Sequence, residues 1–169
     1  MHPPDPFFQF AQGPIELDRG ALLIAQEHRP DLDIAHYLRI LDGLADGFSP
    51  PNLSSDLQDT IGCFNTYLFE ELGFRGNREA YDDPQNSYLD AVLERRLGIP
   101  ITLSLIYIEI GRRVGLSLSG VNFPYHFLVR CDASNEPLFI DPFLGGICLH
   151  RAQSVSYTHL TLPTRRGGG

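Results

Sequence analysis

A helix that must be covered on almost every side is the feature that most constrains this fold. Residues 100–114 repeat apolar side chains at helical spacing. The apolar positions are Ile101, Leu103, Leu105, Ile106, Ile108, Ile110 and Val114. They occupy nearly every side of a helix, and apolar surface is unfavourable in water. We therefore expect the rest of the chain to wrap around this helix.

A shorter helix precedes it and meets it at residues 98–100. Ser87-x-x-Asp90 resembles a capping box, which predicts the start of the shorter helix. Its buried stripe consists of Leu89, Val92, Leu93 and Leu97. Gly98 is expected to end this helix. Pro100 suits the first turn of the next one, because a missing N–H costs nothing at that position.

Three further helices are predicted upstream, over residues 15–27, 34–44 and from 54 or 55 to 71. The first two form an antiparallel hairpin, with Asp31 or Asp33 as the cap of its second helix. Residues 1–14 are rich in proline and phenylalanine and are expected to form an irregular arm. Residues 75–85 are polar and predict an exposed loop.

From Ser117 onward the apolar period changes to two, which is typical of strands. We expect strands at 119–123, 126–131, 138–141 and 147–149, separated by short turns. Successive strands with short turns predict an antiparallel sheet. The predicted fold class is α+β, with an N-terminal helical bundle followed by a small antiparallel sheet packed on the buried helix.

A single domain is expected over residues 15–154, helical over 15–116 and mainly strands over 117–154. Residues 155–169 do not continue these patterns. Within them, SYTHLTLPT resembles the translated adaptor sequence that contaminates some metagenome-derived proteins. We interpret 155–169 as a non-native tail, so that the native protein would continue beyond residue 154. The alternative is an edge strand with a short tail.

The acidic composition limits the classes of partner. The net charge is −8, with 13 Lys and Arg against 21 Asp and Glu, and such a chain repels phosphate backbones. No segment reaches the roughly 18 apolar residues that a membrane span requires. The N-terminal residues lack the basic and apolar regions of a signal peptide. We therefore expect a cytoplasmic protein that binds neither nucleic acid nor membranes.

The three cysteines, Cys63, Cys131 and Cys148, are widely spaced along the chain. This spacing fits neither a disulfide framework nor a zinc knuckle. Free cysteine is among the most buried residue types, so buried reduced thiols are the expected state. Because strand alternation points Cys131 and His126 to opposite faces, that thiol is a poor partner for the histidine.

His126 and Asp141 are the residues most suggestive of chemistry. A histidine that opens one strand and an aspartate that ends another can meet at one end of a sheet. The aspartate would then orient the imidazole, as in Cys/His/Asp and Ser/His/Asp sites. The alternative is a satisfied core histidine and an Asp-Pro turn. A metal site that adds Asp82 or Asp83 has no supporting ligand spacing, so no metal or cofactor is expected.

Four segments of the chain resemble a bacterial family, the SirB-type transglutaminase-like proteins. They are residues 15–44, the stretch NSYLDAVLERRLGIPITLSLIYIEIGRRVGL, the segment NFPYHFLVR and the segment FIDPFLGG. Together the resemblance covers residues 15–150. Members of this family typically carry a tetratricopeptide-like C-terminal extension, which is the part expected to be missing here.

The resemblance implies a papain-like core in which a helix packs on an antiparallel sheet. In active members a nucleophilic cysteine begins that helix, and the following strands supply histidine and then aspartate. His126 and Asp141 match the last two positions. The resemblance places the nucleophile at the start of the helix, at Pro100 or within a residue or two of it, where there is no cysteine. Proline cannot supply the thiolate that a helix N-terminus and a neighbouring histidine would stabilise.

Thr102 and Ser104 are the hydroxyls nearest to this position. A hydroxyl needs a stronger base than a thiol does, and capping or bonding to the helix backbone is the expected use of both side chains. Thr102 is therefore a weak catalytic candidate beside the pair formed by His126 and Asp141.

Two hypotheses follow from a retained His/Asp pair beside a lost nucleophile. The first is a pseudoenzyme that serves as a regulatory or binding module for a peptide or protein. Its cleft would be lined by the His/Asp pair and by Tyr125, Asn86, Tyr88 and Pro100. The second is an enzyme that acts on amide or peptide bonds through an unconventional nucleophile or a metal. The second hypothesis requires a hydroxyl, a thiol or a metal within reach of His126.

Overall fold

The computed structural model describes residues 16–50, 56–124, 126–132 and 136–150. The α-helices are α2 (Leu17–His28), α3 (Ile34–Asp46), α4 (Leu57–Asn65), α5 (Leu89–Arg95) and α6 (Pro100–Arg113). Shorter helical turns are η1 (Thr66–Glu71, π-helical), η2 (Pro84–Ser87) and η3 (Pro142–Leu144). The strands are β1 (Arg75–Gly76), β2 (Leu97–Gly98), β3 (Leu118–Phe123), β4 (His126–Cys131), β5 (Leu138–Asp141) and β6 (Ile147–His150). No helix within these ranges is long and apolar enough to cross a membrane.

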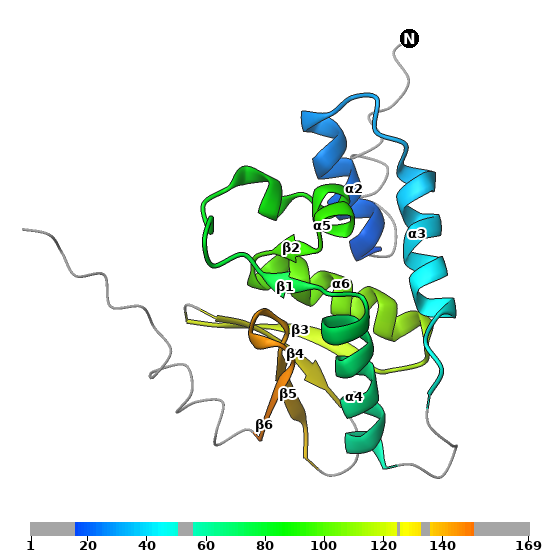
Figure 1. Cartoon of the computed structure of the whole chain (residues 1–169), viewed down its shortest axis with the longest axis vertical. Helices are drawn as coiled ribbons and strands as arrows, with labels where there is room; N and C mark the ends of the chain where they lie inside the picture. Colours follow the sequence, from blue (N-terminus) through cyan, green and yellow to red (C-terminus); the bar gives the residue numbers. More distant parts are fainter. Residues whose placement is uncertain (1–15, 51–55, 125, 133–135, 151–169) are drawn as a thin grey trace, which may run out of the picture.

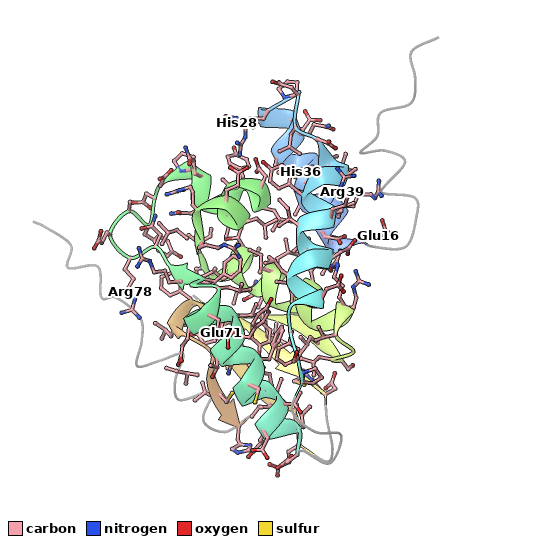
Figure 2. All side chains as sticks on the ribbon, turned by 45° about the vertical axis from the view of Figure 1, so that its right-hand side comes forward. Glu16, His28, His36, Arg39, Glu71 and Arg78 are labelled. Atoms are coloured by element: carbon pink, nitrogen blue, oxygen red, sulfur yellow. The ribbon has the colours of Figure 1, made fainter. Side chains whose placement is uncertain are left out.

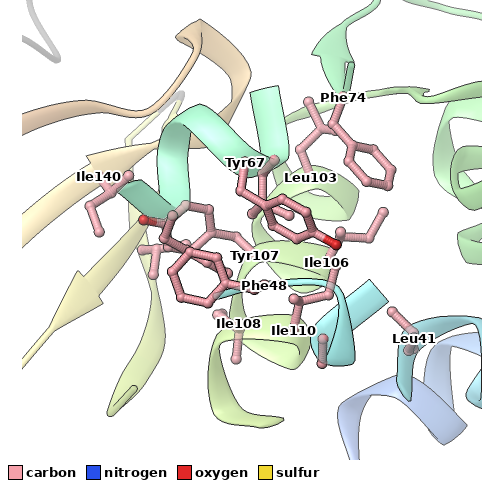
Figure 3. Close-up of a cluster of buried hydrophobic side chains, with 14 of the residues drawn as sticks. Leu41, Phe48, Tyr67, Phe74, Leu103, Ile106, Tyr107, Ile108, Ile110 and Ile140 are labelled. Atoms are coloured by element: carbon pink, nitrogen blue, oxygen red, sulfur yellow. The ribbon is translucent and has the colours of Figure 1, made fainter. Parts of the chain in front are cut away.

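The apolar helix α6 lies at the centre, as its sequence predicts. Figure 1 shows it between the α2–α3 pair and the main sheet, with α4 beside it. Tyr107, in its middle, is fully buried and meets the ring of Phe64 edge-on, with the centroids 4.8 Å apart. Phe48 and Tyr67 from neighbouring elements complete this aromatic part of the core (Figure 3). The surrounding elements therefore cover the helix as its pattern requires.

The main sheet has the order β3-β4-β5-β6, with every neighbouring pair antiparallel. The mixed fold with an antiparallel sheet is therefore confirmed, and the four strands lie within a residue of their predicted bounds. Gly120 faces α6, since a Cβ there would lie 3.6 Å from Ile108 Cδ1. Val129 is paired with Gly120 and Ile140 with Val129, so these three positions share the face that packs on α6.

The helix caps show where local patterns succeeded and failed. Asp33 caps α3 as predicted, accepting a hydrogen bond from the His36 N–H at 3.2 Å. The predicted capping box at the start of α5 is wrong, because the N-cap is Tyr88 and no side chain bonds there. Asp90 is instead buried and forms an ion pair with Arg29 on α2. A tertiary contact has taken the carboxylate that the local pattern assigned to a cap.

The end of α5 also differs from the prediction. The helix stops at Arg96, which adopts a left-handed φ of 62°, and not at Gly98. Gly98 belongs to β2, which pairs in parallel with β1. A Cβ on Gly98 would lie 2.9 Å from Thr102 Oγ1, so the glycine allows a close approach to the first turn of α6. Residues 75–85, expected to form an exposed loop, therefore contribute strand β1, which pairs with β2 beside that turn.

A buried ion network joins α2 to the C-terminal end of α6. Arg113 contacts Asp18 Oδ2 at 2.6 Å through Nη2 and Glu109 Oε2 at 2.9 Å through Nη1. Its Nε contacts Asp42 Oδ1 on α3 at 2.7 Å. Asp18 and Glu109 are almost fully buried. One guanidinium therefore compensates two buried carboxylates and ties three helices together.

Candidate functional site

The start of α6 is the position where the family resemblance expects a nucleophile. Pro100 is the first residue of the helix, and Ile99 precedes it as the N-cap. Proline suits this position because the missing N–H would have no partner in the first turn. Ile101 follows with its side chain 54% exposed. The helix therefore begins with three residues that carry neither a thiol nor a hydroxyl.

Thr102 is held by its own neighbourhood. Its Oγ1 donates to the Asn86 carbonyl at 2.7 Å and accepts from the Ile99 N–H at 3.1 Å. The side chain is buried. Both the proton and a lone pair of the hydroxyl are therefore used in joining the first turn of α6 to the preceding segment. Ser104, two residues further along α6, is also buried, and its Oγ lies 3.5 Å from the Phe127 carbonyl oxygen.

We expect Thr102→Val to lower the free energy of unfolding by about 1–3 kcal/mol, because two buried backbone groups lose their partner. Thr102→Ser keeps the hydroxyl and should recover most of that loss. Urea denaturation of the full chain followed by circular dichroism measures both changes. A Val variant as stable as the wild type would show that the hydroxyl is not needed structurally and would reopen a chemical role.

Asn86 is the centre of a second network that supports the same turn. Its Nδ2 donates to the carbonyls of Ala80 at 2.8 Å and Tyr81 at 3.0 Å. Its Oδ1 accepts from Asn77 Nδ2 at 3.0 Å. The side chain is fully buried. Asn86 therefore shapes the loop between β1 and η2, and its amide is not directed to solvent.

The residue after His126, Phe127, contacts α6, because its carbonyl oxygen lies 3.5 Å from Ser104 Oγ. His126 opens β4 and is half-buried. Its strand partner is Phe123, whose ring meets Phe139 edge-on at 5.7 Å. Strand alternation therefore places His126 with these aromatic residues, on the face opposite to the one that carries Val129. This is the face turned away from α6.

Asp141 shares that face, because its neighbour Ile140 points to α6. It is buried, and Oδ1 accepts from the amides of Phe143 at 3.0 Å and Leu144 at 3.3 Å. The carboxylate is therefore the N-cap of η3. By strand register His126 and Asp141 lie on the same face and at the same end of the sheet, and their pairing as a catalytic dyad stays a prediction. η3, which Asp141 caps, packs against α6 and against β1.

The cysteines lie elsewhere. Cys131 is buried on the α6 face, opposite to the face of His126, and burial raises the pKa of its thiol. Cys148 Sγ lies 3.7 Å from Asn65 Nδ2, on the same side as Cys131. Cys63 is exposed on α4. The prediction of three buried thiols is therefore right for Cys131 and wrong for the other two.

The other residues predicted for the cleft or for a metal site include Tyr88, Tyr125 and Asp83. Tyr88 is half-buried, and its ring stacks on His28 with the centroids 5.0 Å apart. Tyr125 lies outside the described residues. Asp83 caps η2 and pairs with Arg95 at 3.1 Å. Within the described ranges, no group of three His, Cys, Asp or Glu side chains could hold a metal ion.

Three residues that matter here were missed by sequence reasoning. Asn77 and Asn65 form buried hydrogen bonds that link distant segments, and Asn65 joins the Gly146 carbonyl to the Tyr107 hydroxyl. Ile101 is an apolar residue exposed at the helix start. No periodic signal distinguishes a structural asparagine from a loop asparagine, or an exposed isoleucine from its buried neighbours in an apolar run.

Comparison with known proteins agrees with this architecture. Residues 35–162 match the family model of the transglutaminase-like superfamily. The match runs eight residues into the segment interpreted above as a non-native tail, so that interpretation stays a prediction. No solved structure matches the chain.

Relatives occur in bacteria and in mammals. A UPF0162 protein of Xylella fastidiosa is 44% identical over 132 residues, which is 75% of this chain and 45% of the relative. A UPF0162 protein of Vibrio cholerae is 34% identical over 136 residues, or 79% of this chain and 50% of the relative. Human F-box only protein 21 is 41% identical over 98 residues, covering 57% of this chain and 16% of that protein. The chain thus spans about half the length of the bacterial relatives.

Proposed function

The chain belongs to the transglutaminase-like superfamily, and from this premise we propose that it is a non-catalytic module that binds a peptide or a protein. Within the superfamily we assign it to the SirB-type branch, on the segments LERRLGIPITLSLIY, PYHFLVR and IDPFLGG. The regulatory role of a pseudoenzyme is part of the same proposal. The proposal concerns this domain and not the activity of the longer relatives, of which the chain spans about half.

The observation that carries the proposal is the composition of the first turn of α6. Pro100 begins α6, where the resemblance expects the nucleophile, and the hydroxyl of Thr102 already donates to the Asn86 carbonyl at 2.7 Å. A thiolate at a helix N-terminus is the group that a histidine would activate. Pro100 and Ile101 carry no nucleophilic group that could attack a carbonyl carbon. Their apolar side chains can instead contact an apolar partner.

Two exposed isoleucines suggest where a partner would bind. Ile101 at the helix start is 54% exposed, and Ile147, paired with Asp141 across β5 and β6, is 45% exposed. Half-buried Tyr88 follows Asn86, whose carbonyl bonds to Thr102 in the first turn of α6, and half-buried His126 shares the sheet face of Ile147. Exposed apolar side chains beside polar groups are a common composition for a recognition surface. Asn86 and Asp141 would act there by positioning backbone, since both side chains bond to backbone groups.

The first test concerns catalysis. The full chain would be incubated with dansylcadaverine as the amine and dimethylcasein as the glutamine donor, and separately with a fluorogenic peptide amide. We expect no incorporation and no hydrolysis above a blank without protein. Turnover that disappears in His126→Ala but persists in His28→Ala would overturn the proposal and favour an amide or peptide bond hydrolase or acyltransferase that uses His126 and Asp141.

The second test concerns binding. A random peptide library displayed on phage would be selected against the full chain, and the selected peptides measured against Ile101→Asp, Ile147→Asp and Ile24→Asp. Ile24 is a matched control, because it is 53% exposed but lies on α2. We expect the first two variants to weaken binding at least about tenfold, or about 1.4 kcal/mol, and the control to leave it unchanged. Peptides that bind all four proteins equally would refute this surface.

A further inference from the structure

An open cleft lies apart from the start of α6, between the end of α3 and the α4–η1 segment. It has a volume of about 890 Å³. One wall is formed by Gly47, Phe48 and Ser49, which follow α3. The other wall is a stripe along α4 and η1, made of Gln58, Asp59, Gly62, Cys63, Thr66, Tyr67 and Glu71. The spacing of this stripe follows the helical repeat, so the cleft is elongated along one helical axis.

The floor of the cleft is aromatic and held in place. Phe48 packs on the rings of Phe64 and Tyr67, with centroid distances of 5.3 and 5.6 Å. The Tyr67 hydroxyl donates to the Leu44 carbonyl at 2.6 Å. A Cβ on Gly47 would lie 2.5 Å from that hydroxyl, so the absence of a side chain there lets the Tyr67 ring lie against the end of α3. Phe64 is fully buried and Phe48 and Tyr67 are each 8% exposed, so only a small part of the last two rings reaches the cleft.

The charges around the cleft are negative. Asp59 lies at one end and Glu71 at the other, and Figure 2 shows Glu71 at the end of η1. The carbonyls of Gly43, Leu44 and Ala45 at the end of α3 already accept hydrogen bonds, so the negative charge comes from the two carboxylates. Among the described residues that line the cleft there is no lysine, arginine or histidine. Burial raises the pKa of Tyr67 and the positive charge of Arg96 partly offsets that rise, but the Arg96 side chain does not line the cleft. Its guanidinium lies over the Phe74 ring, 4.6 Å from the centroid.

We propose that this cleft binds an extended, basic polypeptide segment through its lysine or arginine side chains. A lysine or arginine side chain beside an exposed carboxylate forms a charge-assisted hydrogen bond, and its aliphatic part can pack on apolar wall atoms. Asp59 and Glu71 are separated along the helix by about 18 Å, at the helical rise of about 1.5 Å per residue. An extended peptide covers that length in five to six residues at about 3.3 Å each. Two basic residues five positions apart would therefore reach both carboxylates.

The separation of about 18 Å between Asp59 and Glu71 favours a polypeptide over a small amine. A compact diamine can meet one carboxylate and the aromatic floor, but not both ends of the cleft. The proposal is separate from the surface at Ile101 and Ile147, since none of those residues lines this cleft. Failure of one proposal therefore leaves the other unaffected, and the two are distinguished by which substitutions weaken binding.

The test uses fluorescein-labelled peptides and the full chain, with fluorescence anisotropy at low and high NaCl. The probe is an acetylated and amidated peptide with arginines at its first and sixth positions and Gly-Ser between them. One comparison peptide has the same composition with adjacent arginines, and another replaces both arginines by citrulline. We expect the spaced peptide to bind at least about tenfold more tightly than either, and to weaken as salt rises. Equal binding of the citrulline peptide would overturn the proposal.

Four variants locate the site. Asp59→Asn and Glu71→Gln should each weaken the spaced peptide, whereas Glu79→Gln removes one exposed carboxylate from the β1–η2 loop and should leave binding unchanged. Gly62→Leu places a side chain in the middle of the stripe, where nothing lies within 4 Å of a Cβ. It should abolish binding while the Tm is kept or raised, because leucine is the better helix former. Binding that survives Gly62→Leu, or spermidine binding as tightly as the spaced peptide, would refute the polypeptide assignment.

Cys63 provides an independent readout. Its exposed thiol lies on the stripe between Asp59 and Glu71. The spaced peptide should slow alkylation of Cys63 by iodoacetamide in the wild type, and not in the double variant Asp59→Asn/Glu71→Gln. Peptide mass mapping separates Cys63 from Cys148, whose alkylation rate should stay constant. An unchanged Cys63 rate at saturating peptide would place the binding elsewhere.

Discussion

Replacing Arg113 by leucine should lower the free energy of unfolding by about 3–5 kcal/mol, because buried Asp18 loses its close counter-charge and buried Glu109 keeps only the exposed Arg112. Arg113 is 14% exposed and contacts both Asp18 Oδ2 and Glu109 Oε2. Neither acid can reach bulk water easily, so the loss of the guanidinium is not replaced by hydration. Asp42, which also contacts Arg113, is exposed and contributes little to this loss.

The matched control is the neighbouring residue. Arg112 also contacts Glu109 Oε2 at 2.9 Å, but its side chain is 60% exposed. We expect Arg112→Leu to cost at most about 1 kcal/mol, as for other exposed ion pairs. Guanidinium denaturation of the full chain at neutral pH measures both variants. Equal losses in the two variants would show that burial does not determine the contribution of the network.

The difference between wild type and Arg113→Leu should also depend on pH. Burial raises the pKa of Asp18, but hydrogen bonds from Arg113 and the Arg19 amide outweigh it and lower the pKa below its usual value. A lowered pKa stabilises the fold above the unfolded value of about 3.9, and this contribution is lost as the pH falls through the folded pKa. Without Arg113, burial dominates and protonation relieves the carboxylate. The two stability curves should therefore converge near and below about pH 4.

The sequence predicted the elements of this fold well where one period dominates a segment. The apolar repeat of residues 100–114 requires a central helix, and α6 has that position. The alternation after Ser117 locates β3 to β6 within a residue, because short strands between turns have few alternatives. Side-chain alternation within the strands then follows directly, and it separates the faces of Cys131 and His126 as expected.

Features that depend on tertiary contacts were not predictable in this way. Asp90 fits a cap in sequence but pairs with Arg29, more than sixty positions away. The pairing of β1 with β2 involves only two residues each, too few for any period to show. The exposed thiol of Cys63 faces a cleft formed by the end of α3, and no local pattern reports on that neighbour.

The candidate site shows the same division. The identities of Pro100, His126 and Asp141, and their order along the chain, are visible in the sequence. The use of Asp141 as the cap of η3 is visible only in the geometry, in which Oδ1 accepts two amide hydrogens. A residue that matches a catalytic position in a family can therefore be retained for the turn that it stabilises. This weakens any inference of catalysis drawn from residue identity alone.

Asn86→Ala should be the most damaging single substitution near the candidate site, with an expected loss of about 3 kcal/mol or more in the free energy of unfolding. The side chain is fully buried and satisfies three groups: the carbonyls of Ala80 and Tyr81 and the Asn77 amide. Each buried polar group left without a partner costs about 1–3 kcal/mol. Gln85→Ala is the matched control, since this neighbouring amide side chain is exposed and its truncation should change stability by less than about 0.5 kcal/mol.

Asn86→Asp separates the two halves of this network. The substitution keeps an oxygen for Asn77 Nδ2 but replaces the donors that face the Ala80 and Tyr81 carbonyls, and it buries a charge. We expect it to be at least as destabilising as alanine near neutral pH and to recover as the carboxyl group becomes protonated at low pH, because the neutral acid again offers one donor. Thermal unfolding from neutral to acidic pH measures this recovery.

The same experiment bears on how Asn86 contributes to recognition. The Asn86 carbonyl accepts from Thr102, so the residue connects the β1–η2 loop to the first turn of α6, beside exposed Ile101. If Asn86 acts by positioning, selected peptides should lose affinity for Asn86→Ala in proportion to its instability and regain it when the variant is stabilised by cooling. If affinity is lost in a variant whose fold is intact, the amide itself contacts the partner, and the hydrogen bonds to Ala80 and Tyr81 must open when the partner binds.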